Sequence, residues 1–533
     1  MYPQPLIDAV LERLREAPDR EALCDAQGAV TRGELFAASG RVAFELLQSG
    51  VRSGDRLLLG LAPDRRYVVA LLAALRLGVL IVPLHRKAKL REVKHLVWDA
   101  GPRLAFVDEP LAAVVRECAA GVRLLDLDAL ARERRLVVAD DPEEAVQDAI
   151  EAETLPEFDE EIELTRDHAG AAVASDAPAL ILYTSGTTGT PKGAVHTHGS
   201  LGSNVAALRT AWRLGADDRL LHCLPLHHLH GLVVGLLGCL AAGSACELEA
   251  DFDATRALAR MARTGATLFF GVPAMYAKLL EVAAVSSLPP LPRLRLFVSG
   301  SAPLPPAQKR AFEERFGCAI LERYGATEIG IALSQRLDGP RPAGSVGGPL
   351  PGVETRVARP REGDAGPAAD AGDAAPEPSE GELLVRGPSL FRGYFEDEEA
   401  TAKVMEDGWY RTGDLVRRGA DGSFAILGRL TTDQIKVKGH RVGALEVEAA
   451  LAEHPGVAEV AVVGAPDPEC GEVVVAFVRA RDATLTVAQL EAHARATLAP
   501  HQVPRRFEFV DDLPRTGPGK VDKRTLQARA RGE

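Results

Sequence analysis

The sequence has few cysteines and no spacing that would join them into a structural site. Its seven cysteines are scattered along 533 residues and include no C-x-x-C pair. A scattered set of odd number predicts neither a disulfide framework nor a zinc ribbon. We therefore expect a protein of a reducing compartment and place it in the cytoplasm.

The chain also lacks an excess of basic residues and any long uninterrupted apolar run. It has 62 Lys and Arg residues against 75 Asp and Glu residues, a formal net charge of −13. That balance argues against nucleic acid as a partner. The first residues include acidic side chains and no apolar core, unlike a secretory peptide. Arg76 interrupts the apolar stretch Tyr67–Leu84, and Gly231–Cys246 is short and rich in Gly and Ala. We expect no stable membrane insertion.

The length and patterning of the chain predict two domains. Helix-like segments alternate with short apolar runs up to about residue 135 and again from 200 to about 357. This alternation is typical of an α/β body of mostly parallel sheets with packed helices. After Gly428 the pattern changes to a small α+β unit. We place the domains at 1–428 and 429–533.

Several segments carry their own expectations. In the second domain, residues 441–456 and 486–498 have helical periodicity, and 457–467 and 472–480 resemble strands. The acidic stretch 140–164 is expected to be a solvated connector. Residues 361–382, rich in Pro, Ala, Gly and acidic side chains, are expected to be disordered or hairpin-like.

One loop has the composition of a phosphate-binding site. The apolar run Ala177–Tyr183 predicts a buried strand, and "TSGTTGTPKG" follows it at 184–193. Its glycines permit close backbone approach, while its free N–H groups and hydroxyls donate hydrogen bonds. It is not the usual nucleotide loop, because Lys192 follows a proline and precedes no Ser or Thr. The alternative is a flexible surface loop.

Six further motifs follow this loop in a fixed order. They are "PLHHLHG" (225–231), "SGSAPL" (299–304), "ERYGATE" (322–328), "WYRTGDL" (409–415), "GRLTTDQIKVKGHRV" (428–442) and "PRTGPGKVDKR" (514–524). With these motifs the chain resembles the adenylate-forming superfamily of acyl-CoA synthetases, peptide-synthetase adenylation domains and luciferases over nearly its full length. The resemblance implies an AMP-forming acid–CoA ligase that uses ATP, Mg²⁺ and coenzyme A, with a mobile C-terminal domain.

The resemblance also implies which residues contact the nucleotide and coenzyme A. They are Thr184, Ser185, Gly186, Thr187, Thr188, Gly189, Lys192, Ser301, Ala302, Glu322, Tyr324, Gly325, Thr327, Asp414, Arg429, Gly439 and Arg441. Within this set the loop ending at Lys192 would hold the β- and γ-phosphates, and Thr327 the α-phosphate. Asp414 would accept the ribose hydroxyls with Arg429 beside it. Glu328 would bind Mg²⁺, which prefers carboxylate oxygen.

Lys520 is expected to be the main catalytic cation. It lies in the Gly-Pro-Gly-Lys loop of the second domain, so docking of that domain would carry its ammonium to the phosphates. The alternative is an ordinary surface lysine, because Lys523 and Arg524 lie close by. By resemblance the domain then turns at Thr431 or Thr432, after which Gly439 lines the pantetheine tunnel. The acceptor is CoA or, as an alternative, a carrier protein.

The identity of the acid depends on fewer residues. Four histidines crowd residues 221–231, but no second ligand cluster accompanies them, which argues against zinc. By resemblance His228 is the gate residue at the carboxylate, with His230 beside it, and both would contact the substrate along with Ser301. His222 and His227 are expected to pack in the core.

Several strings resemble the malonyl-CoA synthetase branch in particular. They are "HHLHGL", "SGSAPL", "LERYGATEIGIALS" and "GRLTTD" with "GALEVE". In that branch an arginine on the next helix pairs with the second carboxylate, and Arg310 matches it, which implies malonate or methylmalonate. Arg310 also lies three and four residues before Glu313 and Glu314, so a surface ion pair is equally open, and Lys309 lies closer to the buried face. The rival functions are a ligase for a medium-chain or aryl acid, a carrier-loading enzyme, and a nucleotide-binding protein without turnover.

Overall fold

The structure is a computed structural model. It describes residues 4–119, 121–127, 173–184, 191–285, 290–359, 378–430, 433–438, 440–515 and 521–533, with the backbone but not the side chain of Arg441. The expectations for the acidic connector at 140–164 and for the hinge at Thr431 or Thr432 therefore fall outside the described residues.

Two large sheets form the N-terminal body in the described part of the chain. The first is nine-stranded in the order β15-β14-β13-β12-β11-β9-β10-β1-β2, and the second is seven-stranded in the order β18-β8-β7-β4-β3-β5-β6. The strands of the first are β1 (Glu21–Asp25), β2 (Gly28–Thr31), β9 (Arg219–His222), β10 (Ala245–Leu248), β11 (Leu268–Gly271), β12 (Leu296–Ser299), β13 (Leu321–Ala326), β14 (Gly330–Ser334) and β15 (Gly348–Pro349). Those of the second are β3 (Arg56–Gly60), β4 (Leu80–Pro83), β5 (Leu104–Val107), β6 (Arg123–Leu124), β7 (Pro178–Thr184), β8 (Lys192–Thr197) and β18 (Gly393–Tyr394).

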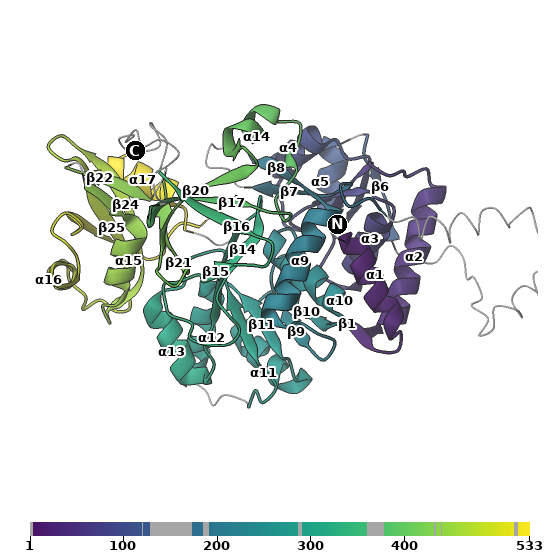
Figure 1. Cartoon of the computed structure of the whole chain (residues 1–533), viewed down its shortest axis with the longest axis horizontal. Coiled ribbons are helices and arrows are strands. Elements are labelled where there is room, and N and C mark those ends of the chain that lie inside the picture. Colours follow the sequence, from purple (N-terminus) through teal and green to yellow (C-terminus); the bar gives the residue numbers. More distant parts are fainter. Residues whose placement is uncertain are drawn as a thin grey trace, which may run out of the picture.

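Most neighbouring strands of these two sheets run parallel, including β9 with β10 and β11, β11 with β12, and β12 with β13. The central strands are short and almost wholly buried, as β4 and β11 show, because helices cover the sheets. Figure 1 shows these helices around the sheets. They are α1 (Leu6–Glu16), α2 (Arg32–Gln48), α3 (Arg65–Arg76), α4 (Leu90–Ala100), α5 (Leu111–Cys118), α9 (His198–Trp212), η1 (His230–Leu237), α10 (Gly238–Ala242), α11 (Ala254–Thr264), α12 (Pro273–Val285) and α13 (Pro306–Phe316).

Two smaller sheets complete the described chain. One contains β16 (Glu354–Ala358), β17 (Glu380–Arg386), β19 (Met405–Glu406), β20 (Trp409–Arg418) and β21 (Phe424–Arg429), next to α14 (Glu398–Val404). The other contains β22 (Gln434–Val437), β23 (His440–Gly443), β24 (Val457–Asp467), β25 (Gly471–Ala480) and β26 (Arg506–Phe509). The helices α15 (Ala444–Ala452), α16 (Val487–Thr497) and α17 (Lys523–Arg531) belong to this last unit, which has its own buried clusters.

The predicted fold class, an α/β body with a small α+β C-terminal domain, is confirmed. The strand predictions at 457–467 and 472–480 correspond to β24 and β25, and the helix predicted at 486–498 corresponds to α16. The helix predicted at 441–456 was partly wrong, because its first residues form β23 and α15 begins at Ala444. Glu380–Glu382, the end of the biased segment, lie in β17, which pairs antiparallel with β16; residues 360–377 are not described.

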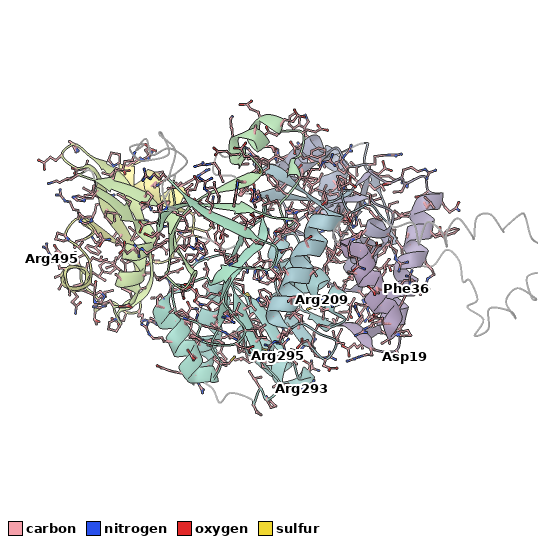
Figure 2. All side chains as sticks on the ribbon, viewed as in Figure 1. Asp19, Phe36, Arg209, Arg293, Arg295 and Arg495 are labelled. Carbon is pink, nitrogen blue, oxygen red and sulfur yellow. The ribbon has the colours of Figure 1, made fainter. Side chains whose placement is uncertain are left out.

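The two ends of the central strands differ in chemistry. At the amino end of β12, Arg295 forms an ion pair with Asp218, with Nη2 and Oδ2 separated by 2.6 Å. Figure 2 shows Arg293 and Arg295 at the lower edge of the body, and Arg495 of α16 at the opposite end of the molecule from Phe36 of α2. At the carboxyl end, Ser299 is the last residue of the strand, and Gly300 and Ser301 of the same motif follow it. In parallel α/β sheets ligands bind at that end.

Among the described residues, no helix combines the length and the apolar character that crossing a lipid bilayer requires.

Candidate active site

The turn between β13 and β14 carries Thr327 and Glu328. Asn204 of α9 fastens this hairpin, because its side chain donates to the Ile331 carbonyl at 2.8 Å and accepts from the Ile331 N–H at 3.1 Å. A Cβ on Gly325 would lie 2.1 Å from a backbone oxygen of the opposite strand, so only glycine fits there. The turn is thus held in one position from both sides.

His196 also holds this turn, and the sequence analysis missed it. Its Nε2 lies 2.5 Å from the Thr327 carbonyl oxygen. Since a carbonyl only accepts, Nε2 must carry the hydrogen. Burial lowers the pKa of His196 to about 4, so the ring is neutral at pH 7 and still donates. The only signal in the sequence was its place in "HTHG" (196–199), which begins three residues after Gly193, the end of the phosphate loop motif.

Glu328 is buried, with 8% of its surface exposed. The Tyr394 hydroxyl donates to its Oε1 at 2.8 Å, and its own carbonyl accepts from the Phe391 N–H at 2.8 Å. No group of three or more His, Cys, Asp or Glu side chains suited to a metal ion occurs in the described residues. A lone carboxylate suits Mg²⁺ better than a metal that needs a protein cage, because Mg²⁺ completes its coordination with phosphates and water.

Three predicted nucleotide residues meet at Asp414. Arg429 faces Asp414 across the antiparallel pair β20–β21, and its Nε lies 2.8 Å from Asp414 Oδ1. The Tyr324 hydroxyl donates to Oδ2 of the same carboxylate. The Asp414 charge raises the pKa of Arg429, while burial and then Asp414 raise the pKa of Tyr324. Each carboxylate oxygen has a second lone pair, so Asp414 keeps capacity to accept from a sugar hydroxyl.

The described ends of the phosphate loop are held by α4. Thr184 ends β7 and Lys192 begins β8, while residues 185–190 are not described. On α4, His95 Nε2 lies 2.9 Å from the Pro191 carbonyl oxygen, and Asp99 accepts a hydrogen bond from the Tyr183 hydroxyl. The predicted strand before the loop is confirmed as β7, and both ends of the loop are anchored to one helix.

His230 and Ser301 lie together at the carboxyl ends of the strands. Ser301 Oγ is 3.4 Å from His230 Nδ1, and Ser301 has a left-handed backbone conformation with φ of 68°. Such a conformation is uncommon for a non-glycine residue and is found at functional turns. Burial, with a smaller contribution from the Arg323 charge, lowers the pKa of His230 well below its usual value. His230 is therefore a neutral hydrogen-bonding group here.

Arg323 is the charged group beside this pair. Its side chain is buried, with 5% of the residue exposed, and its Nη2 lies 3.5 Å from Ser301 Oγ. Among the described residues its Nε has no hydrogen-bond partner, and no carboxylate contributes to its electrostatic environment. Burial lowers the pKa of Arg323 to about 9. A Cβ on Gly300 would lie 2.3 Å from the guanidinium carbon, so the arginine occupies space that glycine leaves open.

Arg310 does not join this group. Its side chain is 58% exposed, and its Nη2 lies 3.6 Å from Glu453 Oε1 in the C-terminal unit. The helix α13 instead turns Lys309 inward, where Nζ lies 2.8 Å from Glu322 Oε1 and 3.0 Å from Gln335 Oε1. This position favours the surface ion pair as the role of Arg310, and its contact with the acid stays a prediction. The Glu322 carboxylate thus pairs with Lys309 inside the fold, and its role toward the nucleotide stays a prediction.

His85, His227 and His228 form a row of tilted ring contacts. The rings of His227 and His228 lie 3.9 Å apart, and those of His85 and His227 lie 4.7 Å apart. His228 is partly exposed, whereas His222 is 2% exposed at the end of β9. A gate role for His228 remains a prediction.

The other predicted site residues are placed only in part. Ala302 is exposed directly after Ser301. Ser185 to Gly189, Gly439 and Lys520 lie outside the described residues, as does the side chain of Arg441. Their roles stay predictions.

We expect the stability of this body to fall as pH falls from 6.5 toward 4. Burial lowers the pKa of His196, His198 and His222 to about 4 each, against about 6.5 in an unfolded chain. The unfolded state therefore takes up protons first. Each histidine should lower the free energy of unfolding by up to about 2 kcal/mol between pH 7 and pH 5. Urea unfolding at both pH values measures this loss, and His198→Leu should show a smaller loss than wild type. An equal loss in the variant would contradict the lowered pKa assigned to His198.

Comparison with known protein families gives two matches in one chain. The family described as AMP-binding enzyme matches residues 10–395, and the AMP-binding enzyme C-terminal domain matches residues 446–520. The mitochondrial malonate–CoA ligase of Homo sapiens is 36% identical over 543 residues, which cover 95% of this chain and 89% of that protein. A feruloyl-CoA synthase of Amycolatopsis is 34% identical over 523 residues, covering 97% and 98% of the two chains.

Among solved structures, ATP-bound MatB from Rhodopseudomonas palustris superimposes with a TM-score of 0.83 at 33% sequence identity, and the match covers 99% of each chain. The two matched domains span most of the chain in the order that the motifs predict. The chain belongs to the AMP-binding enzyme family and is an acid–CoA ligase of the AMP-forming class.

Proposed function

We propose that this ligase activates malonate or methylmalonate. The acid is first joined to AMP, with release of pyrophosphate, and is then transferred to the thiol of coenzyme A. Relatives of similar identity are named for different acids, malonate in one case and ferulate in another. Overall identity therefore does not choose the substrate, and the choice must come from the site.

The buried Arg323 is the observation that supports a second anionic group on the acid. An ionised arginine is costly to bury without a partner, and its planar donors match a carboxylate. Among the described residues no carboxylate supplies that partner, and Ser301 is its neighbour. A dicarboxylate bound near His230 and Ser301 would neutralise this charge. A medium-chain or aryl acid would leave it unpaired.

ATP and Mg²⁺ complete the proposed first step. Attack of a carboxylate on the α-phosphorus brings two anions together, so fixed cations and N–H dipoles must offset the charge. Thr327 is held for the α-phosphate by His196 and Asn204, and Asp414 is set to accept the ribose hydroxyls. Glu328 would hold Mg²⁺ together with the phosphates. Lys520 would add a positive charge when the C-terminal domain docks.

The second step would use the C-terminal domain in another orientation. Gly439 and Arg441 are the residues proposed for the pantetheine tunnel and the nucleotide phosphate of coenzyme A. A carrier protein with the same pantetheine arm is the alternative acceptor. We place the hinge at Thr431 or Thr432, just after the boundary between 1–428 and 429–533.

AMP formation with ATP, Mg²⁺ and coenzyme A, measured across acetate, malonate, methylmalonate, octanoate and benzoate, tests the proposal. Malonate or methylmalonate is expected to give kcat/KM at least about 100-fold above acetate, in keeping with the value of a buried charge pair. Acid-dependent exchange of pyrophosphate into ATP without coenzyme A should follow the same order. Preference for octanoate or benzoate would contradict the dicarboxylate assignment but not the ligase class.

A further inference from the structure

Tyr394 lies between two residues of the proposed nucleotide site, and none of the motifs singled it out. It belongs to β18, which pairs antiparallel with β8 so that Tyr394 stands opposite Ala194. The strand β8 begins at Lys192. The backbone N–H of Tyr394 donates to Thr401 Oγ1 at 2.9 Å. The side chain thus starts from a fixed backbone next to the end of the phosphate loop.

The hydroxyl and the ring of Tyr394 make different contacts. Its hydroxyl donates to Glu328 Oε1 at 2.8 Å. Its ring lies under Lys192, whose Nζ is 5.2 Å from the ring centroid. That distance is within the range of a cation–π interaction. One residue therefore contacts both the loop lysine and the carboxylate proposed for the metal.

Neighbouring aromatic rings hold the Tyr394 ring in place. Phe391 packs edge-on against it with ring centroids 5.0 Å apart, and against Tyr410 at 5.6 Å. The N–H of Phe391 also donates to the Glu328 carbonyl. The hydroxyl also interacts with the Tyr410 hydroxyl. The ring contacts remain when the hydroxyl is removed, so Tyr394→Phe should leave the ring where it is.

We propose that Tyr394 is a positioning residue that orients the Glu328 carboxylate toward a divalent metal and aligns Lys192 with the same phosphate group. This inference rests on the proposed function of Glu328. The hydroxyl holds one oxygen of the Glu328 carboxylate, and this hydrogen bond also fixes the rotation of the carboxylate group. Mutation of a residue that hydrogen-bonds to a metal ligand commonly lowers metal affinity by 10- to 100-fold.

Equilibrium binding of Mn²⁺, used as a paramagnetic probe for the Mg²⁺ site, tests the proposal without turnover. The free Mn²⁺ signal is followed by electron paramagnetic resonance in the full-length protein saturated with ATP. Tyr394→Phe is expected to raise the Mn²⁺ concentration at half-saturation by about tenfold, while ATP binding without metal changes less than twofold. Tyr394→Leu should also weaken ATP binding without metal, because Lys192 loses the ring.

Three controls separate positioning from a general structural effect. Tyr67→Phe removes another buried hydroxyl, which donates to the Leu226 carbonyl, and should leave Mn²⁺ binding unchanged. In a Glu328→Gln background, Tyr394→Phe should have no further effect on Mn²⁺. Tyr394→His, which keeps a ring and a donor, should bind Mn²⁺ within threefold of wild type and also serves if the Phe variant does not fold.

The outcomes distinguish this proposal from the one on which it rests. If wild type binds ATP without any metal dependence, the role of Glu328 fails. If wild type binds Mn²⁺ through ATP but Tyr394→Phe binds it equally well, or if the effect persists in Glu328→Gln, the role of Tyr394 fails while that of Glu328 stands.

Discussion

Replacing Arg323 with methionine is expected to lower kcat/KM for malonate by about 10²- to 10³-fold, because one partner of a buried charge pair is removed. Activity with acetate should change much less, since a monocarboxylate has no second anion to lose. Arg323→Lys should recover part of the malonate activity, as the charge returns without the planar donors. Steady-state AMP formation with both acids measures the split.

Arg310→Ala is the matched control for this prediction. It removes an arginine that is 58% exposed and close to Glu453, so malonate selectivity should stay within twofold of wild type. Gly300→Ala should act like Arg323→Met, because the added Cβ would meet the guanidinium at 2.3 Å. Loss of malonate activity in Arg310→Ala, with none in Arg323→Met, would show that Arg310 and not Arg323 pairs with the second carboxylate.

Lys520→Ala is expected to lower the rate of acyl-adenylate formation by at least about 10²-fold, the usual effect of removing a group that stabilises developing charge. Pyrophosphate exchange measures that step alone. The second step, started from chemically prepared acyl-adenylate and coenzyme A, should keep most of its rate, because domain rotation would withdraw Lys520 from the site.

The control for Lys520 is Lys403→Ala, which removes a surface lysine of α14 that pairs with Glu399 and is 68% exposed. It should leave both steps unchanged. A Lys520→Ala enzyme with full exchange activity would show that this lysine is an ordinary surface residue. Equal losses in both steps would instead indicate a role in folding or in acid binding.

Local patterns predicted the architecture well where burial alone decides it. The strands β7, β24 and β25 coincide with runs of apolar residues, and such runs are buried in whatever fold contains them. The helix at 441–456 was misjudged because Arg441 and Val442 continue the helical pattern, whereas pairing with β22 draws them into β23. Strand pairing is a tertiary interaction that helical periodicity does not contain.

The site was predicted in the same uneven way. Motif order indicated Thr327, Asp414 and Arg429, and the structure brings Arg429 and Tyr324 to Asp414. It did not indicate His196 or Tyr394, whose contacts join strands distant in the sequence. These residues have ordinary neighbours along the chain, so only the fold reveals what they hold.

The reaction class could be predicted from the sequence alone, because the segments proposed to bind phosphate and ribose need particular glycines, hydroxyls and carboxylates in order. Only the fold shows which of two arginines is buried next to the proposed acid site. Arg310 and Arg323 have the same chemistry, but α13 leaves the first in solvent, while β13 buries the second beside Ser301. Charge is expensive to bury without a partner, so the position of a guanidinium relative to the core, rather than its place in a motif, sets what it can bind.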